Sequence, residues 1–141
     1  AGLALFLGGT AAQADALAPQ PRRFTLDCQN RAVPPPIPTW RVDVNLDLKV
    51  FYVEGDNEPH VNQVISDDGD RIVFRNWRHM EHNMVSGSDE AFVRSTGGWF
   101  FYVSTLEPER AADAQCRIIP PRDGFQADTP FEMPKDGPWV P

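Results

Sequence analysis

Residues 41–53, RVDVNLDLKVFYV, carry the clearest structural pattern in the chain. Polar residues fill most of the positions between a regular apolar set, which consists of Val42, Val44, Leu46, Leu48, Val50 and Tyr52. Successive side chains of a strand point to opposite faces of a sheet. We therefore predict one long strand, with its apolar face in a core and its polar face, which includes Asp43, in water.

Shorter runs on both sides of this stretch also predict strands. Residues 24–30, FTLDCQN, alternate between apolar and polar in the same way. Residues 60–66 and 71–77 flank the sequence DDGD at residues 67–70, and an Asp-Gly turn between two β-rich runs is typical of a hairpin.

The second half of the chain continues this pattern. Two more strands are predicted at residues 80–86, MEHNMVS, and 91–95, AFVRS, with a turn at GSDE between them. STGG then leads into a strand at WFFYVST, and residues 116–119 form the closing strand. Residues 106–115 begin with an early proline followed by good helix formers, which predicts one short helix.

These elements together define the expected fold class. We predict an all-β protein, a small antiparallel barrel or sandwich of about eight strands with one short helix and a Pro-rich C-terminal tail. The 141 residues suffice for one domain of ordinary size.

The expected organisation has four parts. Residues 1–14 resemble the end of a secretory signal peptide, with a short apolar run followed by small residues, although an apolar leader that remains on the protein is the alternative. Residues 15–23 form a linker, residues 24–119 the β domain, and residues 120–141 a Pro-rich acidic tail. The tail either lies over the domain or docks on a partner, and we favour the first arrangement.

Two cysteines, Cys28 and Cys116, lie near opposite ends of the predicted domain. An even number of cysteines in an exported chain predicts a disulfide, whereas two free thiols are the alternative. Export and a disulfide both predict a periplasmic or secreted protein.

The charge excludes several classes of function. A net charge of −7 disfavours binding to nucleic acid, and the sequence has no second long apolar run that would predict an integral membrane protein.

Ser86 and Ser88 lie near His82 and Asp89, but their spacing is not that of a nucleophile elbow. We predict no catalytic residues, and so a protein that is not an enzyme.

The sequence RHMEHNM at residues 78–84 contains two of the three histidines and two of the three methionines. On a strand, Met80, His82 and Met84 would share one face, and thioether and imidazole ligands suit Cu(I). His79 would lie on the other face as a weaker candidate ligand. The alternative, which we favour, is that the Met80–His82–Met84 face packs in the core and that the protein holds no cofactor.

Exposed aromatic residues offer a second candidate site. In the strand WFFYVST, Trp99, Phe101 and Val103 share one face and Phe100 and Tyr102 the other, so one pair of aromatics is expected outside. The candidate interaction patch consists of Trp77, Phe100, Tyr102 and Trp139. The alternative, which we favour, is that the tail or the helix covers this surface.

An exported small β domain with a disulfide between its first and last strands resembles the MliC family of periplasmic inhibitors of C-type lysozyme. The resemblance covers residues 24–119 and rests on size, export and cysteine placement. The family's Ser-Ala-Ser-Gly-Ala-like loop is not matched, and the nearest segment is SGSDEA at residues 86–91. The resemblance implies inhibition of a lysozyme as one activity.

The sequence thus predicts a non-catalytic, extracytoplasmic binding or interaction module, such as an inhibitor or an envelope-associated factor. Its partner would be a protein or an envelope component. The alternative function is a periplasmic copper-binding protein that uses the methionine and histidine face.

Overall fold

The computed structural model describes residues 20–31, 37–103 and 110–136. The predicted signal remnant, most of the predicted linker and Trp139 lie outside these ranges. Within the described residues, no helix is both long and apolar enough to cross a membrane.

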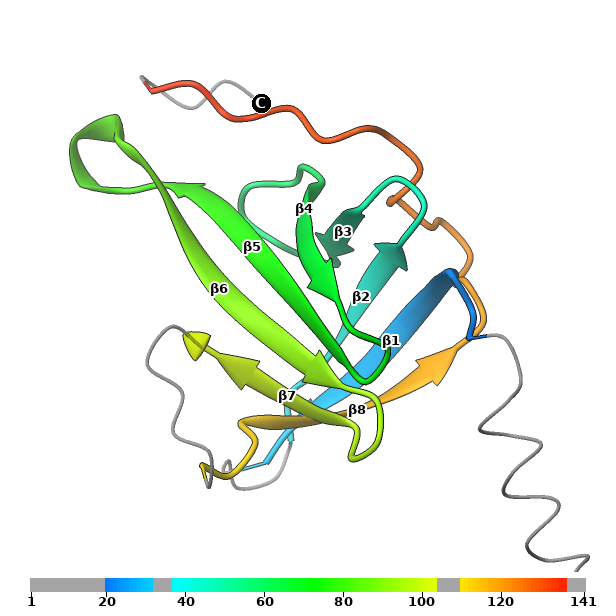
Figure 1. Ribbon diagram of the computed structural model, residues 1–141. Coiled ribbons are helices and arrows are strands. Elements are labelled where there is room, and N and C mark those ends of the chain that lie inside the picture. Colours follow the sequence, from blue (N-terminus) through cyan, green and yellow to red (C-terminus); the bar gives the residue numbers. More distant parts are fainter. Residues whose placement is uncertain (1–19, 32–36, 104–109, 137–141) are drawn as a thin grey trace, which may run out of the picture.

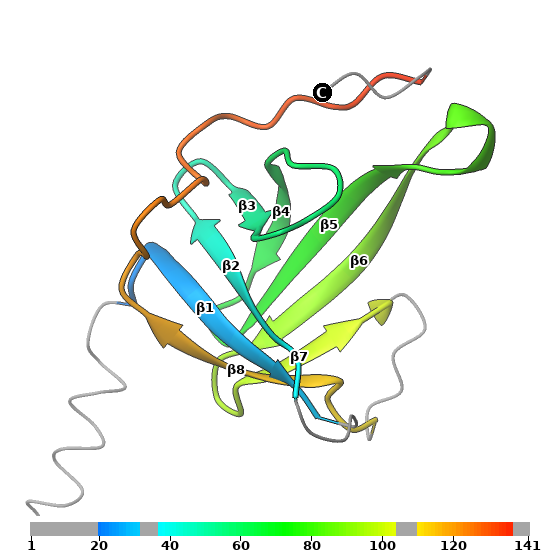
Figure 2. The same ribbon diagram turned by 180° about the vertical axis from the view of Figure 1, so that it is seen from behind.

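Eight antiparallel strands form a closed barrel, in which each strand pairs with the next along the chain and β1 pairs with β8 (Figure 1). The same closure is seen from behind in Figure 2. The strands are β1 (Arg23–Asn30), β2 (Thr39–Asn45), β3 (Val50–Val53), β4 (Asn62–Asp67), β5 (Arg71–His79), β6 (Val85–Val93), β7 (Gly98–Phe101) and β8 (Ala114–Ile119). The predicted all-β class and the barrel are confirmed.

The long strand predicted at residues 41–53 is wrong in one respect, because it is a hairpin of β2 and β3. The Asn45 side-chain oxygen accepts hydrogen bonds from the backbone amides of Asp47 and Leu48, at 3.1 Å each. Lys49 then takes a positive φ of 57°. This turn changes the phase of the alternation, so that Phe51 and not Val50 joins the hydrophobic core cluster.

The prediction for residues 80–90 is also wrong, because the turn lies earlier than expected. Residues 80–84 form the tip of the β5–β6 hairpin, closed by a hydrogen bond of 2.7 Å from the Met80 amide to the Met84 carbonyl. The tip contains the short 3₁₀ turn η1 (Glu81–Asn83), in which His82 has a φ of 63°. The GSDE segment expected to turn is instead part of β6 and pairs with β5.

The predicted helix at residues 106–115 is absent from the part of that segment that the structure describes. Residues 110–113 are not helical, and Ala114 and Gln115 already belong to β8. The Asp113 amide donates to the Trp99 carbonyl, and the Asp113 carboxylate accepts from the Phe101 amide, so contacts with β7 outweigh helix propensity here.

Aromatic rings fill the interior of the barrel. The Trp99 ring stacks on Phe74 at 5.1 Å between centroids and meets Trp40 edge-on at the same distance. Phe51 packs against Phe74 at 4.8 Å. Trp99, Phe74 and Phe51 are fully buried, which is typical of a small barrel whose interior is filled by side chains.

The predicted disulfide joins Cys28 to Cys116 and is confirmed. The two cysteines lie directly opposite each other on β1 and β8, the first and last strands of the barrel. The bond therefore crosses the seam at which the two ends of the sheet meet, and both sulfurs face the core cluster.

Residues 120–136 of the tail lie along the outside of the barrel (Figures 1 and 2). Polar contacts hold them: Asp128 forms a two-point ion pair with Arg23, at 2.9 and 2.7 Å, and Ala127 is fully buried. The Arg23 guanidinium also lies 4.1 Å from the centre of the Phe125 ring. The tail thus covers part of the outer face of β1 and β2.

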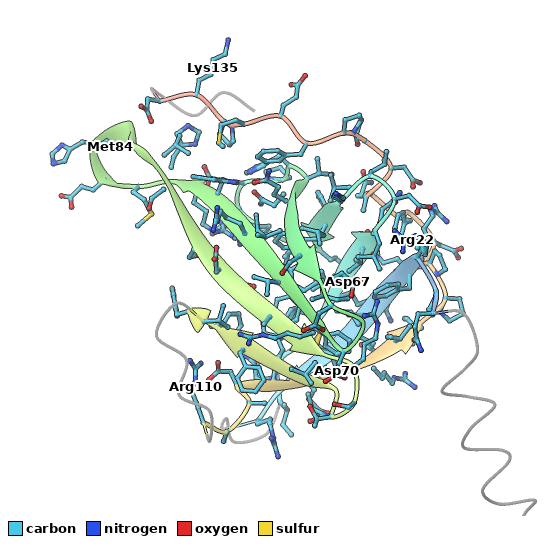
Figure 3. All side chains as sticks on the ribbon, in the orientation of Figure 1. Arg22, Asp67, Asp70, Met84, Arg110 and Lys135 are labelled. Atoms are coloured by element: carbon cyan, nitrogen blue, oxygen red, sulfur yellow. A yellow bond between two sulfur atoms is a disulfide. The ribbon has the colours of Figure 1, made fainter. Side chains whose placement is uncertain are left out.

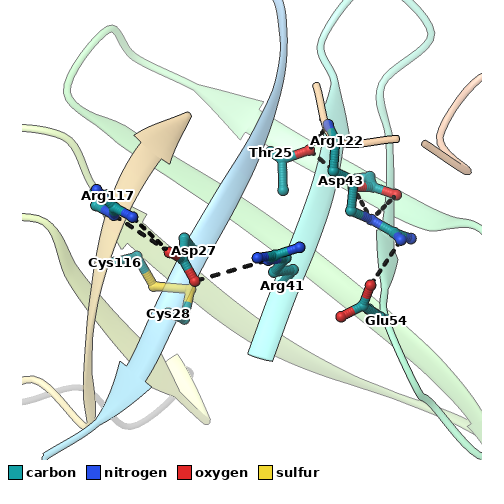
Figure 4. Close-up of polar contacts among 9 residues, drawn as sticks. All are labelled: Thr25, Asp27, Cys28, Arg41, Asp43, Glu54, Cys116, Arg117 and Arg122. Atoms are coloured by element: carbon teal, nitrogen blue, oxygen red, sulfur yellow. Dashed lines mark hydrogen bonds and ion pairs between the residues drawn. A yellow bond between two sulfur atoms is a disulfide. The ribbon is translucent and has the colours of Figure 1, made fainter. Parts of the chain in front are cut away.

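Asp43 lies at the centre of this contact (Figure 4). Its carboxylate accepts hydrogen bonds from the Thr25 hydroxyl at 3.0 Å, from Nε of Arg122 at 2.9 Å and from the Gln126 amide at 2.9 Å. Arg122 also pairs with Glu54 at 2.7 Å. The prediction that Asp43 faces water is wrong, because the tail covers it and leaves it fully buried.

Candidate interaction site on the β5–β6 hairpin

The outer face of the β5–β6 hairpin carries the candidate site, which we call the hairpin groove. It is a surface depression of about 590 Å³ lined by Arg75, Trp77, residues 85–89 and Tyr102. Trp77 and Tyr102 of the predicted aromatic patch therefore meet in one depression, although they come from opposite sides of β6.

Register explains the position of Trp77. It stands directly opposite Gly87, where a Cβ atom would lie only 3.0 Å from the indole Cε3. The glycine therefore makes room for the indole ring to lie across β6. The indole N–H donates to the Gln63 side-chain oxygen at 3.2 Å, which fixes the ring at the floor of the groove.

A charged pair borders the indole. Arg75 and Asp89 stand opposite each other and form two hydrogen bonds, at 2.7 and 3.1 Å. The guanidinium also lies 5.8 Å from the Trp77 ring centre. This border is electrically neutral, so the groove itself favours neither a cationic nor an anionic partner.

The other two residues of the predicted patch stand differently. Tyr102 is 69% exposed and has a φ of 56°, just beyond the end of β7. Phe100 stands opposite Ala91 on the outer face of β7, near the guanidinium of Arg110, and does not line the groove. Trp139 lies outside the described residues.

The groove runs along an open strand edge. β7 pairs only with residues 90–93 of β6, so residues 85–89 are paired on the β5 side alone within the described chain. Figure 1 shows this half of β6 extending past β7 toward the hairpin tip.

The backbone groups on that edge can be assigned from their neighbours. The Trp77 amide donates to Asn62 and the His79 amide to Glu58, so both point away from β6. Their partners Gly87 and Val85 are therefore in non-hydrogen-bonded pairs, with amides that point to the open edge. The Val85 amide indeed donates outward, to the Asp136 carboxylate at 2.8 Å.

The predicted metal-binding residues lie at the hairpin tip and not in the core, as Figure 3 shows for Met84. Met80 is 56% and Met84 62% exposed, and the His82 side chain is 84% exposed. The preference for a core position was wrong, because the chain turns here and leaves no strand face to bury. No group of three or more His, Cys, Asp or Glu side chains in the described residues is placed to hold a metal.

His79 has a different environment from the other three. Its Nδ1 lies 2.7 Å from Glu58 and its Nε2 lies 2.9 Å from the carbonyl oxygen of Lys135 in the tail. The Lys135 carbonyl and then the Glu58 carboxylate raise the pKa of His79 above its usual value. His79 therefore links β5 to the tail and points away from a site at the tip.

The residues weighed for catalysis do not assemble in the described structure. Asp89 is paired with Arg75, and His82 stands at the exposed tip, near Glu81 at 3.9 Å. Ser86 and Ser88 lie on β6 as strand residues. In the described structure, Ser86, Ser88, His82 and Asp89 are therefore not arranged as a catalytic triad.

Comparison with family models, with curated proteins and with solved structures found no match. The fold and the groove nevertheless define a class: a small disulfide-bridged β-barrel in which, among the described residues, the first half of β6 is paired on one side only. Sequence reasoning identified Trp77 and Tyr102 but missed the edge, because it placed a turn where β6 runs. The one available signal was a single glycine among strand-forming residues, which often marks a close approach.

Proposed function

We propose that this protein is a non-catalytic binding module of an extracytoplasmic compartment that captures an extended protein segment in the hairpin groove. The observation that carries the proposal is the open edge at residues 85–89, bordered by Trp77 and Tyr102. An extended peptide that adds a strand to such an edge gains backbone hydrogen bonds, and side-chain pockets select its sequence.

The local chemistry supports this mode of binding. The amide and carbonyl groups of Gly87 and the neighbouring edge are free of a strand partner within the described residues, and glycine allows a close approach. Trp77 and Tyr102 offer aromatic surfaces of the kind that dominate protein interfaces. An unpaired strand edge tends to pair with a strand of another chain. A binding module can use this tendency to capture an extended peptide.

The compartment is proposed on two grounds. The Cys28–Cys116 disulfide is compatible with an oxidising environment outside the cytoplasm. The apolar leader at residues 1–14 resembles an export signal. A lysozyme of the C type is one protein that the module could bind, as its resemblance to the MliC family implies.

The aromatic contribution gives the first test. Peptides selected from a random linear library on the purified protein should lose about 10- to 100-fold in affinity for the Tyr102→Ala variant, the loss typical of an interface hot spot. Titration calorimetry measures the affinities. Tyr52→Ala is the matched control, since Tyr52 is the other tyrosine and lies on β3, outside the groove.

Hydrogen exchange identifies where such peptides bind. Bound peptide should slow exchange of the Gly87 and Asp89 amides and leave the amides of β1 and β2 unchanged. The proposal fails if the selected peptides protect another surface, or if Tyr52→Ala weakens binding as much as Tyr102→Ala.

A Cu(I) site at the hairpin tip is the second candidate function. The observation that favours it is the exposure of Met80 and Met84 across a closed two-strand tip, with His82 between them. Soft thioether ligands with an imidazole suit Cu(I). The site would be formed on binding, by side chains that are free to move in solvent.

Copper titration tests this second function. A competition assay with a Cu(I) chelator should show at least about tenfold weaker binding for the Met80→Leu/Met84→Leu variant, because it removes both soft ligands. Met133→Leu is the control, since Met133 is the third methionine and is 50% exposed on the tail. Equal copper affinity in the two variants would exclude the tip as the site.

A further inference from the structure

A second pocket opens inside the barrel, at the end from which the β5–β6 hairpin extends. It has a volume of about 260 Å³, slightly below the roughly 300–1,000 Å³ of common ligand pockets. Trp40, Val53 and Phe101 form its apolar walls, and Asn30, Asn76, Arg78 and Glu90 its polar ones. It lies on the inner face of the sheet, so it is separate from the hairpin groove on the outer face.

Glu90 is the unusual group in this pocket. It is 8% exposed and stands between Phe74 on β5 and Phe101 on β7. Burial raises the pKa of Glu90 to about 7, while the Asn76 side chain and the charge of Arg78 act in the opposite direction. A glutamate in a pocket whose pKa lies close to neutral pH is a frequent sign of a functional site.

The charges around Glu90 leave it without a cation of its own. Arg78 forms an ion pair with Asp56 and lies 3.9 Å from Glu58, which also pairs with His79, so the charge of Arg78 is already matched by carboxylates of the β3–β4 loop. No ion pair of Glu90 is present within the described part of the chain. The pocket therefore carries an excess of negative charge whenever Glu90 ionises, which disfavours an anionic ligand.

The aromatic walls of the pocket favour a positively charged ligand. The Trp40 and Phe101 rings lie 6.0 Å apart, and the Trp40 indole N–H is fixed by a hydrogen bond of 2.9 Å to Asn30. Aromatic faces attract cations, most strongly where water is excluded. The pocket thus combines the carboxylate of Glu90 with the aromatic rings of Trp40 and Phe101, and these groups together can bind an organic cation.

We propose that this pocket binds a small organic ammonium ion that carries an apolar group, with Glu90 as its counter-ion and Trp40 and Phe101 as its aromatic walls. The ammonium supplies the positive charge that Glu90 lacks, and the apolar group replaces water against Val53 and the rings. This inference does not depend on the hairpin groove or on its partner.

Binding by this mechanism is linked to protons. Below the pKa of Glu90 the carboxyl group is protonated, so the ammonium must displace a proton before it forms the ion pair. Affinity should therefore rise by up to about tenfold per pH unit as the pH approaches the pKa, and level off above it. Arg78 lines the same pocket, and Asp56, Glu58 and His79 are the other charged or titratable groups that ion pairs connect to it.

Three matched probes test the proposal by titration calorimetry: 2-phenylethylamine, the neutral 2-phenylethanol and the anionic phenylacetate. We expect the amine to bind at least about tenfold more tightly than either of the others at about pH 8, and more weakly at about pH 5.5. Nuclear magnetic resonance should show the shift of the Trp40 indole N–H on binding.

Two variants sharpen the test. Glu90→Gln keeps the shape of the side chain and should lower the amine affinity at least about tenfold and remove its pH dependence. Glu132→Gln, on the exposed tail, should change neither. The proposal is overturned if no probe binds, if the alcohol binds as tightly as the amine, if Glu90→Gln leaves the affinity unchanged, or if the Trp40 signal does not move. The pH series on the unchanged protein decides the matter if the variant does not fold.

Discussion

Asp43→Ala is expected to lower the free energy of unfolding by about 3–5 kcal/mol, the range for removing one partner of a buried ion pair. Arg122 is only 14% exposed in its side chain and would keep Glu54 alone as its partner. The Thr25 hydroxyl and the Gln126 amide would lose an acceptor as well. Urea denaturation followed by tryptophan fluorescence measures the loss.

A matched control separates burial from charge. Asp47→Ala removes an ion pair of 2.5 Å with Arg22, but the side chains of that pair are 58% and 69% exposed. Exposed pairs contribute about 0–1 kcal/mol, so this variant should be nearly as stable as the parent. Limited proteolysis should cut the tail of Asp43→Ala faster than that of Asp47→Ala. Equal stability of the two variants would mean that the contact of Asp43 with the tail does not stabilise the barrel.

Removal of the disulfide is expected to have an effect of similar size. The Cys28→Ala/Cys116→Ala variant should lose about 2–5 kcal/mol, because the bond joins residues 88 positions apart and its loss frees the unfolded chain. The six residue pairs between β1 and β8 would then hold the seam alone. Thermal unfolding with and without a reductant measures the change.

The reductant provides the control in that experiment. The parent protein should become less stable on reduction, whereas the double variant should not respond. A double variant within about 1 kcal/mol of the oxidised parent would contradict a stabilising role for the bond, since native disulfides of small domains usually contribute more.

The class of fold could be predicted because it depends on local patterns. Alternation at residues 24–30 and the Asp-Gly turn at residues 67–70 each predict structure from a few neighbouring residues, and β1, β4 and β5 confirm them. The disulfide followed from the number and placement of Cys28 and Cys116 together with the predicted strands around them.

The turns inside uniform stretches could not be predicted in the same way. At residues 46–49 the alternation continues through a turn that depends on the Asn45 side chain and on a positive φ at Lys49. At the β5–β6 tip the pairing of nine residues on each side, including Trp77 opposite Gly87, decides where the chain reverses. The position of such a turn depends on which residues of the two strands pair with each other. The alternation within one strand does not specify that pairing.

The sequence by itself therefore determined the all-β class, most of the strands and the disulfide. Only the tertiary structure decided which polar residues are buried and which apolar residues are exposed. Asp43 is buried because a tail 79 residues further along the chain supplies Arg122, and Glu90 is buried because β6 lies between β5 and β7. Met80 and Met84 are exposed because the hairpin extends past its neighbours. A period of two fixes which side chains share a face, but the partner that covers that face comes from distant parts of the chain.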